Sequence, residues 1–189
     1  MQLVEHATFA TLTLKPLQQQ QAEAFLAHIN DNRDIYEEVI PFVSRTHNLA
    51  QMQTVISANL TRQSQGEALF YTLWDGEVMA GYLLVREINR DANWAEIGYM
   101  LGKQWQRQGI TTMACRWLIE HLFASGLDKI ALCCNDDNQG SIAIAEKLGF
   151  KLEGILRQYF VVNGKRRNMC CYGLLKDEWL GEPACNYSR

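Results

Sequence analysis

The junction at residues 104–114, where a polar loop joins two regular segments, most constrains the fold. Residues 94–101 before the loop have the composition of a β-strand. After the loop, apolar residues recur at steps of three and four, which predicts a helix: Ile110, Met113, Ala114, Trp117, Leu118 and Leu122. Gly109 stands where the chain must turn and where the backbone can approach another group closely.

A helix that begins at such a loop can bind an anion. Its first N–H groups have no partner inside the helix, and the helix dipole adds positive potential there. The junction therefore suits a pyrophosphate. An ordinary loop with a convenient glycine would give the same pattern, so the stretch alone leaves both interpretations open.

The composition indicates a single soluble globular domain over residues 1–189, with 48% apolar and 21% charged residues. The net charge is −3 and no block of five basic residues occurs, so nucleic acid is not an expected partner. We find no signal-peptide pattern and no apolar run of membrane-spanning length. We therefore expect a cytoplasmic protein without a membrane partner.

The six cysteines lack the spacing of a metal site. Four of them form the adjacent pairs Cys133-Cys134 and Cys170-Cys171, in strand-like runs where neighbours point to opposite faces. There is no C-x-x-C spacing and no clustered histidine, so we expect no metal. Most of the cysteines are interpreted as small core residues.

The hydrophobic pattern predicts an α/β chain with a mixed sheet. Predicted strands are residues 8–14, 68–74, 78–88, 94–101, 129–134, 150–162 and 165–174. Predicted helices are residues 18–29, 34–40, 48–63, 109–126 and 138–148. Asp75-Gly76 and Asn163-Gly164 are hairpin signals. Meanders that flank one or two crossover units imply both parallel and antiparallel pairs.

Three motifs resemble those of the GNAT superfamily of N-acetyltransferases. Residues 106–111 resemble its Arg/Gln-x-x-Gly-x-Gly/Ala loop, which cradles the pyrophosphate of coenzyme A, although Thr111 replaces the usual small residue. Residues 95–99 resemble its fourth strand, and residues 138–141 with 146–150 resemble an Asn-x-x-Ser…Lys-Leu-Gly-Phe segment. The resemblance covers nearly the whole chain and is weakest between residues 30 and 65.

The resemblance implies a mixed, mostly antiparallel seven-stranded sheet with helices on both faces. The fourth and fifth strands splay apart, and the thioester of acetyl-coenzyme A lies in the gap. The implied coenzyme-binding residues are Tyr99, Met100, Leu101, Gln106, Arg107, Gln108, Gly109, Ile110, Thr111, Thr112, Asn138, Ser141 and Lys147. Asn138 would also serve as a helix N-cap, and Lys147 would equally be a solvated helix charge. Relatives often form dimers, and the apolar second hairpin suggests a homodimer here.

Two residues are candidates for proton transfer. In the family, a Glu at the position of Glu96 accepts the proton of the amine, but Glu96 would also serve as an ion-pair partner of Arg86, Arg90 or Lys103. Ser141 is the candidate acid for the leaving thiolate, because Ala145 stands where many relatives have a Tyr. A first-turn serine that bonds its own backbone is the alternative for Ser141.

The acceptor is an amine whose identity is left open. Tyr36, Glu37 and Glu38 fall in the helical region that lines the acceptor side of the family, where acidic residues would attract an ammonium or form a solvated helix face. Residues 32–43 resemble the ribosomal-protein-serine branch, whereas residues 152–175 match the polyamine and antibiotic branches nearly as well. We therefore expect acetylation of the N-terminal α-amine of a ribosomal or other protein. The alternatives are a small amine such as a polyamine, an aminoglycoside or an amino-acid derivative, and a non-catalytic acyl-coenzyme A-binding regulator.

Overall fold

The computed structural model describes residues 7–162 and 164–179. The strands are β1 Ala7–Phe9, β2 Leu12–Pro16, β3 Leu69–Asp75, β4 Val78–Asn89, β5 Trp94–Leu101, β6 Lys129–Asn135, β7 Lys151–Val162 and β8 Lys165–Leu175. The α-helices are α1 Ala22–Asp31, α2 Arg33–Tyr36, α3 Leu49–Ser64, α4 Ile110–Ala124 and α5 Gln139–Lys147. Short 3₁₀ turns occur at Gln19–Gln21, Val43–Arg45, Lys103–Trp105 and Lys176–Glu178.

The described strands form one eight-stranded sheet in the order β1-β2-β3-β4-β5-β6-β8-β7. The predicted number of seven is wrong, because the segment predicted as one strand over residues 8–14 is a hairpin. Ala10 takes a φ of +54°, and Phe9 pairs with Leu12 across the turn. Phe9, Leu12 and Leu14 are all buried, so the turn keeps their side chains in the core.

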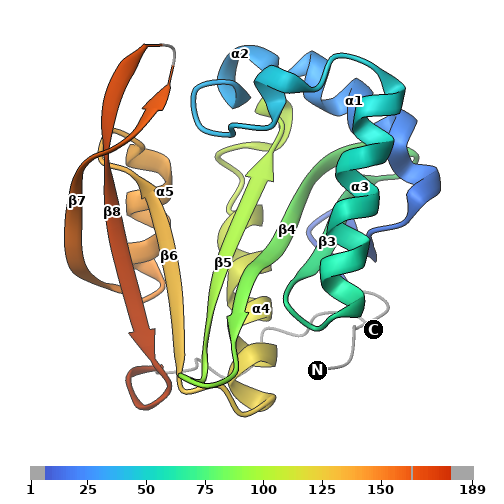
Figure 1. The fold of residues 1–189 in the computed structure, drawn as a ribbon. Coiled ribbons are helices and arrows are strands. Elements are labelled where there is room, and N and C mark those ends of the chain that lie inside the picture. The colour runs from blue at the N-terminus through green and yellow to red at the C-terminus, as the bar shows by residue number, and fades with distance from the viewer. Residues whose placement is uncertain (1–6, 163, 180–189) are drawn as a thin grey trace.

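The only parallel pair in this sheet is β5 with β6. The two strands pair only over Trp94–Ile97 and Lys129–Leu132. Beyond these residues they diverge toward the top of the molecule (Figure 1). The prediction of a mixed, mostly antiparallel sheet with splayed central strands is confirmed.

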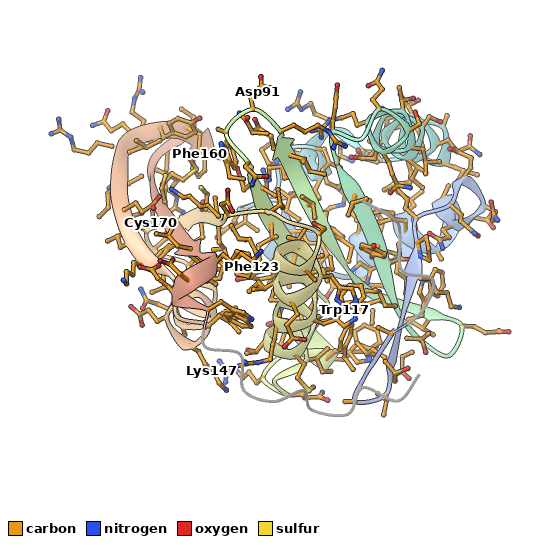
Figure 2. The ribbon with its side chains drawn as sticks, turned by 90° about the horizontal axis from the view of Figure 1, so that it is seen from below. Asp91, Trp117, Phe123, Lys147, Phe160 and Cys170 are labelled. Carbon is orange, nitrogen blue, oxygen red and sulfur yellow. The ribbon has the colours of Figure 1, made fainter. Side chains whose placement is uncertain are left out.

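Helices cover both faces of the sheet, as predicted, and divide the core in two. On one face α1 and α3 pack against β3 and β4, whereas α4 and α5 lie on the other face (Figures 1 and 2). The predicted apolar stripe of α4 is buried, including Ile110, Ala114, Trp117, Leu118 and Leu122. The hydrophobic effect therefore fixes α4 against β5, with its N-terminus at the end of the polar loop.

The region between α1 and α3 departs most from the prediction. The helix predicted over residues 34–40 is a single turn, α2, followed by hydrogen-bonded turns. Arg33 holds the loop that follows, because its guanidinium donates to the carbonyl oxygens of Val43 and Thr46, each at 2.8 Å. The turn predicted at Asn163-Gly164 joins β7 and β8, but Asn163 lies outside the described residues, as does Cys185.

The described cysteines fit the prediction of small packing residues. Cys115, Cys134 and Cys170 are buried, whereas Cys133 and Cys171 are half-buried. Cys133 and Cys171 are directly paired across β6 and β8. Within residues 7–162 and 164–179, no group of three His, Cys, Asp or Glu residues is placed to hold a metal ion.

Candidate active site

A cavity of about 970 Å³ opens where β5 and β6 diverge. One end is lined by the loop before α4, and the middle is lined by β5, β6 and the start of α5. The other end lies between the segment after α2 and the β7–β8 hairpin. Because β5 and β6 diverge here, the ends of these strands, the N-terminus of α4 and the loop before it surround one open space.

The loop before α4 is fixed by hydrogen bonds from its side chains and backbone. The Trp105 indole donates to Asp75 Oδ2 at 3.0 Å, and the Gln106 amide donates to the carbonyl oxygen of Leu101 at 2.8 Å. The Lys103 backbone N–H donates to Asn32 Oδ1 at 2.9 Å. These bonds attach the loop to three other parts of the chain, so its backbone is preorganised.

The same loop contains two residues in the left-handed backbone region. Gly109 is the N-cap of α4 with a φ of +77°, and Arg107 has a φ of +61°. A Cβ at Gly109 would meet no protein atom within 4 Å. The side-chain position of Gly109 is therefore open, and the free N–H groups of α4 begin beside it. This arrangement fits the predicted pyrophosphate of coenzyme A.

Glu96 lies near the middle of β5, on the cavity wall, with 18% of its side chain exposed. Burial raises the pKa of its carboxyl, and Arg86 opposes this increase. Arg86 Nε lies 3.2 Å from Glu96 Oε1, which confirms one of the predicted ion-pair partners. The raised pKa and the position in the cavity suit a general base, and the ion pair does not exclude that role.

A β-bulge on β4 brings Arg86 to Glu96. Val85 pairs with Ile97 and Glu87 pairs with Glu96, so Arg86 is the extra residue without a partner on β5. Bulges redirect side chains in this way. Gly98 lies beside the Arg86 guanidinium, and a Cβ at this glycine would be in ordinary van der Waals contact with it, at 3.6 Å.

Ser141 lies in the first turn of α5, on the cavity wall. Its backbone N–H donates to Asn138 Oδ1 at 3.1 Å, so Asn138 is the helix N-cap, as predicted. The Asn138 amide nitrogen remains available as a donor beside the cavity. Ala145, on the buried face of the same helix, stands where many relatives have a tyrosine and contributes no hydroxyl.

The structure brings eleven of the thirteen predicted coenzyme-binding residues to the cavity wall. They are Tyr99, Met100, Leu101, Gln106, Arg107, Gly109, Ile110, Thr111, Thr112, Asn138 and Ser141. Gln108 and Lys147 are exposed and do not line the cavity. Gln108 instead donates to the carbonyl oxygen of Gln104 at 3.0 Å. The coenzyme contacts of Gln108 and Lys147 stay predictions.

Only one of the three predicted acceptor-side residues lines the cavity. Glu38 does so with an exposed side chain. Tyr36 is fully buried and its hydroxyl lies 2.7 Å from His28 Nε2. Glu37 pairs with Arg33 at 3.0 Å. The prediction for Tyr36 and Glu37 is therefore corrected: they stabilise the turn that presents Glu38.

Several residues of the acceptor end were not predicted from the sequence. Its wall includes apolar and aromatic side chains from α2, from the segment after α2 and from β7, and arginines from α3, β4 and β8. They are Ile35, Val39, Ile40, Phe42, Tyr159, Phe160, Arg62, Arg86 and Arg167. Arg167 pairs with Asp137 across the cavity mouth. Apart from Arg86, which was considered as a partner of Glu96, no local pattern marks these residues, because they come from distant segments that meet only in the folded sheet.

The family model described as "Acetyltransferase (GNAT) domain" matches residues 11–151. The fold and the cavity define the same class, and the chain belongs to the GNAT acetyltransferase family. The prediction of an acetyltransferase of this family, with coenzyme A as co-substrate, is confirmed at the level of the family.

Curated relatives act on different kinds of amine. The chain is 38% identical over 111 residues to a putative ribosomal N-acetyltransferase of Bacillus subtilis, covering 58% of this chain and 60% of that protein. It is 32% identical to the spermidine N(1)-acetyltransferase of Escherichia coli, covering 62% of this chain and 63% of that protein. It is 30% identical to the ribosomal-protein-serine acetyltransferase of Escherichia coli, covering 65% and 69%.

Solved structures support the fold. A RimL ribosomal L7/L12 α-N-protein acetyltransferase in complex with coenzyme A has a TM-score of 0.87 at 24% identity, covering 92% of this chain and 99% of that chain. A microcin C7 self-immunity acetyltransferase in complex with acetyl-CoA and AMP has a TM-score of 0.82 at 26% identity, covering 88% of this chain and 93% of that chain.

Among residues 7–162 and 164–179, no helix is long and apolar enough to cross a membrane.

Proposed function

We propose that this protein transfers the acetyl group of acetyl-coenzyme A to the N-terminal α-amine of a protein. The observation that carries the proposal is the single cavity that joins an anion-binding helix terminus to a half-buried carboxylate. The terminus would hold the pyrophosphate, and the carboxylate lies where an amine would enter. The names of two relatives, a ribosomal N-acetyltransferase and a ribosomal-protein-serine acetyltransferase, support this choice of acceptor.

Each candidate residue has a definite task in this reaction. Glu96 accepts a proton from the acceptor ammonium, directly or through water, because only the free amine is a nucleophile. Ser141 gives a proton to the sulfur that leaves the acetyl carbon with the electron pair of their bond. The N-terminal α-amine has a pKa near 8, so a carboxylate whose pKa is raised by burial is a suitable base.

The charges along the cavity favour a peptide N-terminus over a polyamine. The wall carries four arginines, Arg62, Arg86, Arg107 and Arg167, and three carboxylates, Glu38, Glu96 and Asp137. Two of these carboxylates are already paired with arginines. A polyamine carries several positive charges and needs several free carboxylates. A peptide presents one ammonium and an extended backbone, which the apolar and aromatic walls near β7 can accommodate.

A direct test compares three acceptors with labelled acetyl-coenzyme A. The panel contains a peptide with a free N-terminal serine, the same peptide with a blocked N-terminus and one internal lysine, and spermidine. We expect acetylation of the first peptide only, located by mass spectrometry, and loss of that signal in Glu96→Gln. Incubation of a cell extract with the enzyme and labelled acetyl-coenzyme A would then identify the natural acceptor.

Two outcomes would replace the proposal. A higher kcat/KM for spermidine than for any peptide would favour the small-amine alternative, which the similarity to the spermidine acetyltransferase supports. Tight binding of acetyl-coenzyme A without turnover of any amine would favour a non-catalytic regulator. The presence of both Glu96 and Ser141 on the cavity wall is the observation against that regulator.

A further inference from the structure

The hydroxyl of Tyr99 is buried and has no hydrogen-bond partner. Among the described residues, only Tyr99 Oη and Arg167 Nε are buried side-chain polar atoms in this condition. Buried polar groups are nearly always hydrogen-bonded, so an exception at a functional cavity needs an explanation. Tyr99 lies on β5, three residues after Glu96, and lines the cavity.

The surroundings of Tyr99 place its hydroxyl at the start of α5. The groups that influence its ionisation belong to Cys115 of α4, Cys134 of β6 and Ser141 of α5. Burial raises the pKa of Tyr99 far above its usual value, and the Ser141 hydroxyl opposes this increase. Ser141 is thus near enough to interact with Tyr99 Oη, although the two do not complete a hydrogen bond of good geometry.

In a hydrogen bond between the Tyr99 and Ser141 hydroxyls, Tyr99 would be the donor and Ser141 the acceptor. Tyr99 keeps its proton throughout the working pH range because its pKa is raised, so toward an oxygen it acts as a donor. Ser141 has its backbone N–H satisfied by Asn138, and its hydroxyl can accept one hydrogen bond while donating another. An alcohol releases a proton less readily than a thiol, so a serine acid benefits from a donor that stabilises its oxygen as the proton leaves.

We propose that Tyr99 is a positioning residue that donates a hydrogen bond to Ser141 Oγ once acetyl-coenzyme A is bound, and so directs the Ser141 proton into the cavity. The inference rests on the proposed function. As the bond between sulfur and acetyl carbon breaks, Ser141 gives its proton to the sulfur, which keeps the bonding electron pair. The Tyr99 hydrogen bond stabilises the oxygen left on Ser141, which regains a proton from solvent after product release.

The first test is a double-mutant cycle with Tyr99→Phe and Ser141→Ala. Phenylalanine retains the ring and removes only the hydroxyl. We expect kcat to fall about tenfold in Tyr99→Phe, the rate equivalent of one hydrogen bond, with KM for acetyl-coenzyme A unchanged. In the Ser141→Ala background the same substitution should have little further effect, because the group through which Tyr99 acts is gone.

The second test separates this role from a structural one. Removal of a hydroxyl without a partner should leave the melting temperature unchanged or raised. The matched control is Tyr36→Phe, which removes a satisfied buried hydroxyl and leaves His28 Nε2 without its partner at 2.7 Å. We expect Tyr36→Phe to lower the melting temperature and Tyr99→Phe not to do so.

A third test needs no turnover and compares binding of coenzyme A with binding of desulpho-coenzyme A by calorimetry. Tyr99→Phe should weaken binding of coenzyme A by a few-fold and leave binding of desulpho-coenzyme A unchanged. Only coenzyme A has a thiol for Ser141 to contact. Equal weakening of both ligands, or of neither, would overturn the inference.

The kinetic tests have equally clear negative results. A tenfold fall in kcat in both the wild-type and Ser141→Ala backgrounds would show that Tyr99 acts independently of Ser141 and would also overturn the inference. The proposed function fails differently. Its failure is a wild-type enzyme that acetylates no amine, whereas the inference fails in an enzyme that is active.

Discussion

Replacement of Arg86 by alanine should shift the acidic limb of the pH–rate profile, because Arg86 stabilises the ionised form of Glu96. The guanidinium lies 3.2 Å from the carboxylate. In a solvent of the dielectric constant of water, two unit charges at that distance attract by about 1.3 kcal/mol, which corresponds to roughly one pKa unit. Arg86 is 60% exposed, so we use the dielectric constant of water, which gives the weakest attraction at this distance.

Measured exposed ion pairs contribute roughly 0.2–1 kcal/mol, which lowers the expected shift. We therefore expect the pKa of Glu96 to rise in Arg86→Ala and the acidic limb to move up by roughly 0.2–0.7 pH units. A base must be deprotonated to act, so activity falls as pH drops through its pKa. A higher pKa of Glu96 moves this loss of activity to higher pH. The variant should therefore be less active than wild type at acidic pH and similar to it at higher pH.

The assay is kcat/KM against pH for wild type, Arg86→Ala and Arg86→Lys, because this ratio reports the ionisations of the free enzyme and free substrate. The same peptide acceptor is used throughout, so ionisation of its amine contributes equally to each profile. Arg86→Lys retains a positive charge and should shift the limb less. Superimposable acidic limbs for wild type and Arg86→Ala would refute the assignment of Glu96 as the base that titrates.

Four further predictions concern the loop, the sheet, the thiols and the exposed edge. Gly109→Val should weaken acetyl-coenzyme A binding at least about tenfold by calorimetry; Gly76→Val, also at a positive φ with open space but outside the cavity, should not. Gly81→Ala would bring a Cβ within 2.2 Å of backbone on β5, so unfolding in urea should show a loss of roughly 1–3 kcal/mol. Burial and the charge of Glu96 raise the pKa of Cys133, so Glu96→Gln should speed its reaction with a thiol reagent at fixed pH; an unchanged rate would contradict their coupling. The exposed apolar side chains of edge strand β7 predict a homodimer, which a sedimentation profile of a pure monomer would disprove.

The parts of the fold that rest on local patterns were predictable from the sequence. The limits of β5 were predicted without error, and those of α4 to within two residues, because one is a short β-rich run between turns and the other carries a long apolar stripe. The loop between them was recognised from Gly109, whose positive φ few other residues would tolerate. Glu96 and Ser141 were named from the resemblance to the GNAT motifs, and both lie on the cavity wall.

The features that were missed or wrongly predicted depend on contacts between distant segments. The turn at Ala10 has no glycine, and the bulge that redirects Arg86 exists only in the register between β4 and β5. Tyr36 was predicted to face a substrate, but its burial against His28 depends on the packing of α1. Four-residue helices carry too little periodicity to reveal which side chains face the core.

The chemistry of the cavity follows from one topological exception in an otherwise antiparallel sheet. A parallel pair requires a crossover connection, and here that connection contains the loop and α4. The crossover places the N-terminus of α4 at the same end of the sheet where β5 and β6 cease to pair. The strands that lose their mutual hydrogen bonds there expose backbone and side chains to the space beside the helix terminus. The proposed anion-binding terminus of α4 and the proposed base Glu96 are therefore adjacent, because both depend on the position of the same strand, β5.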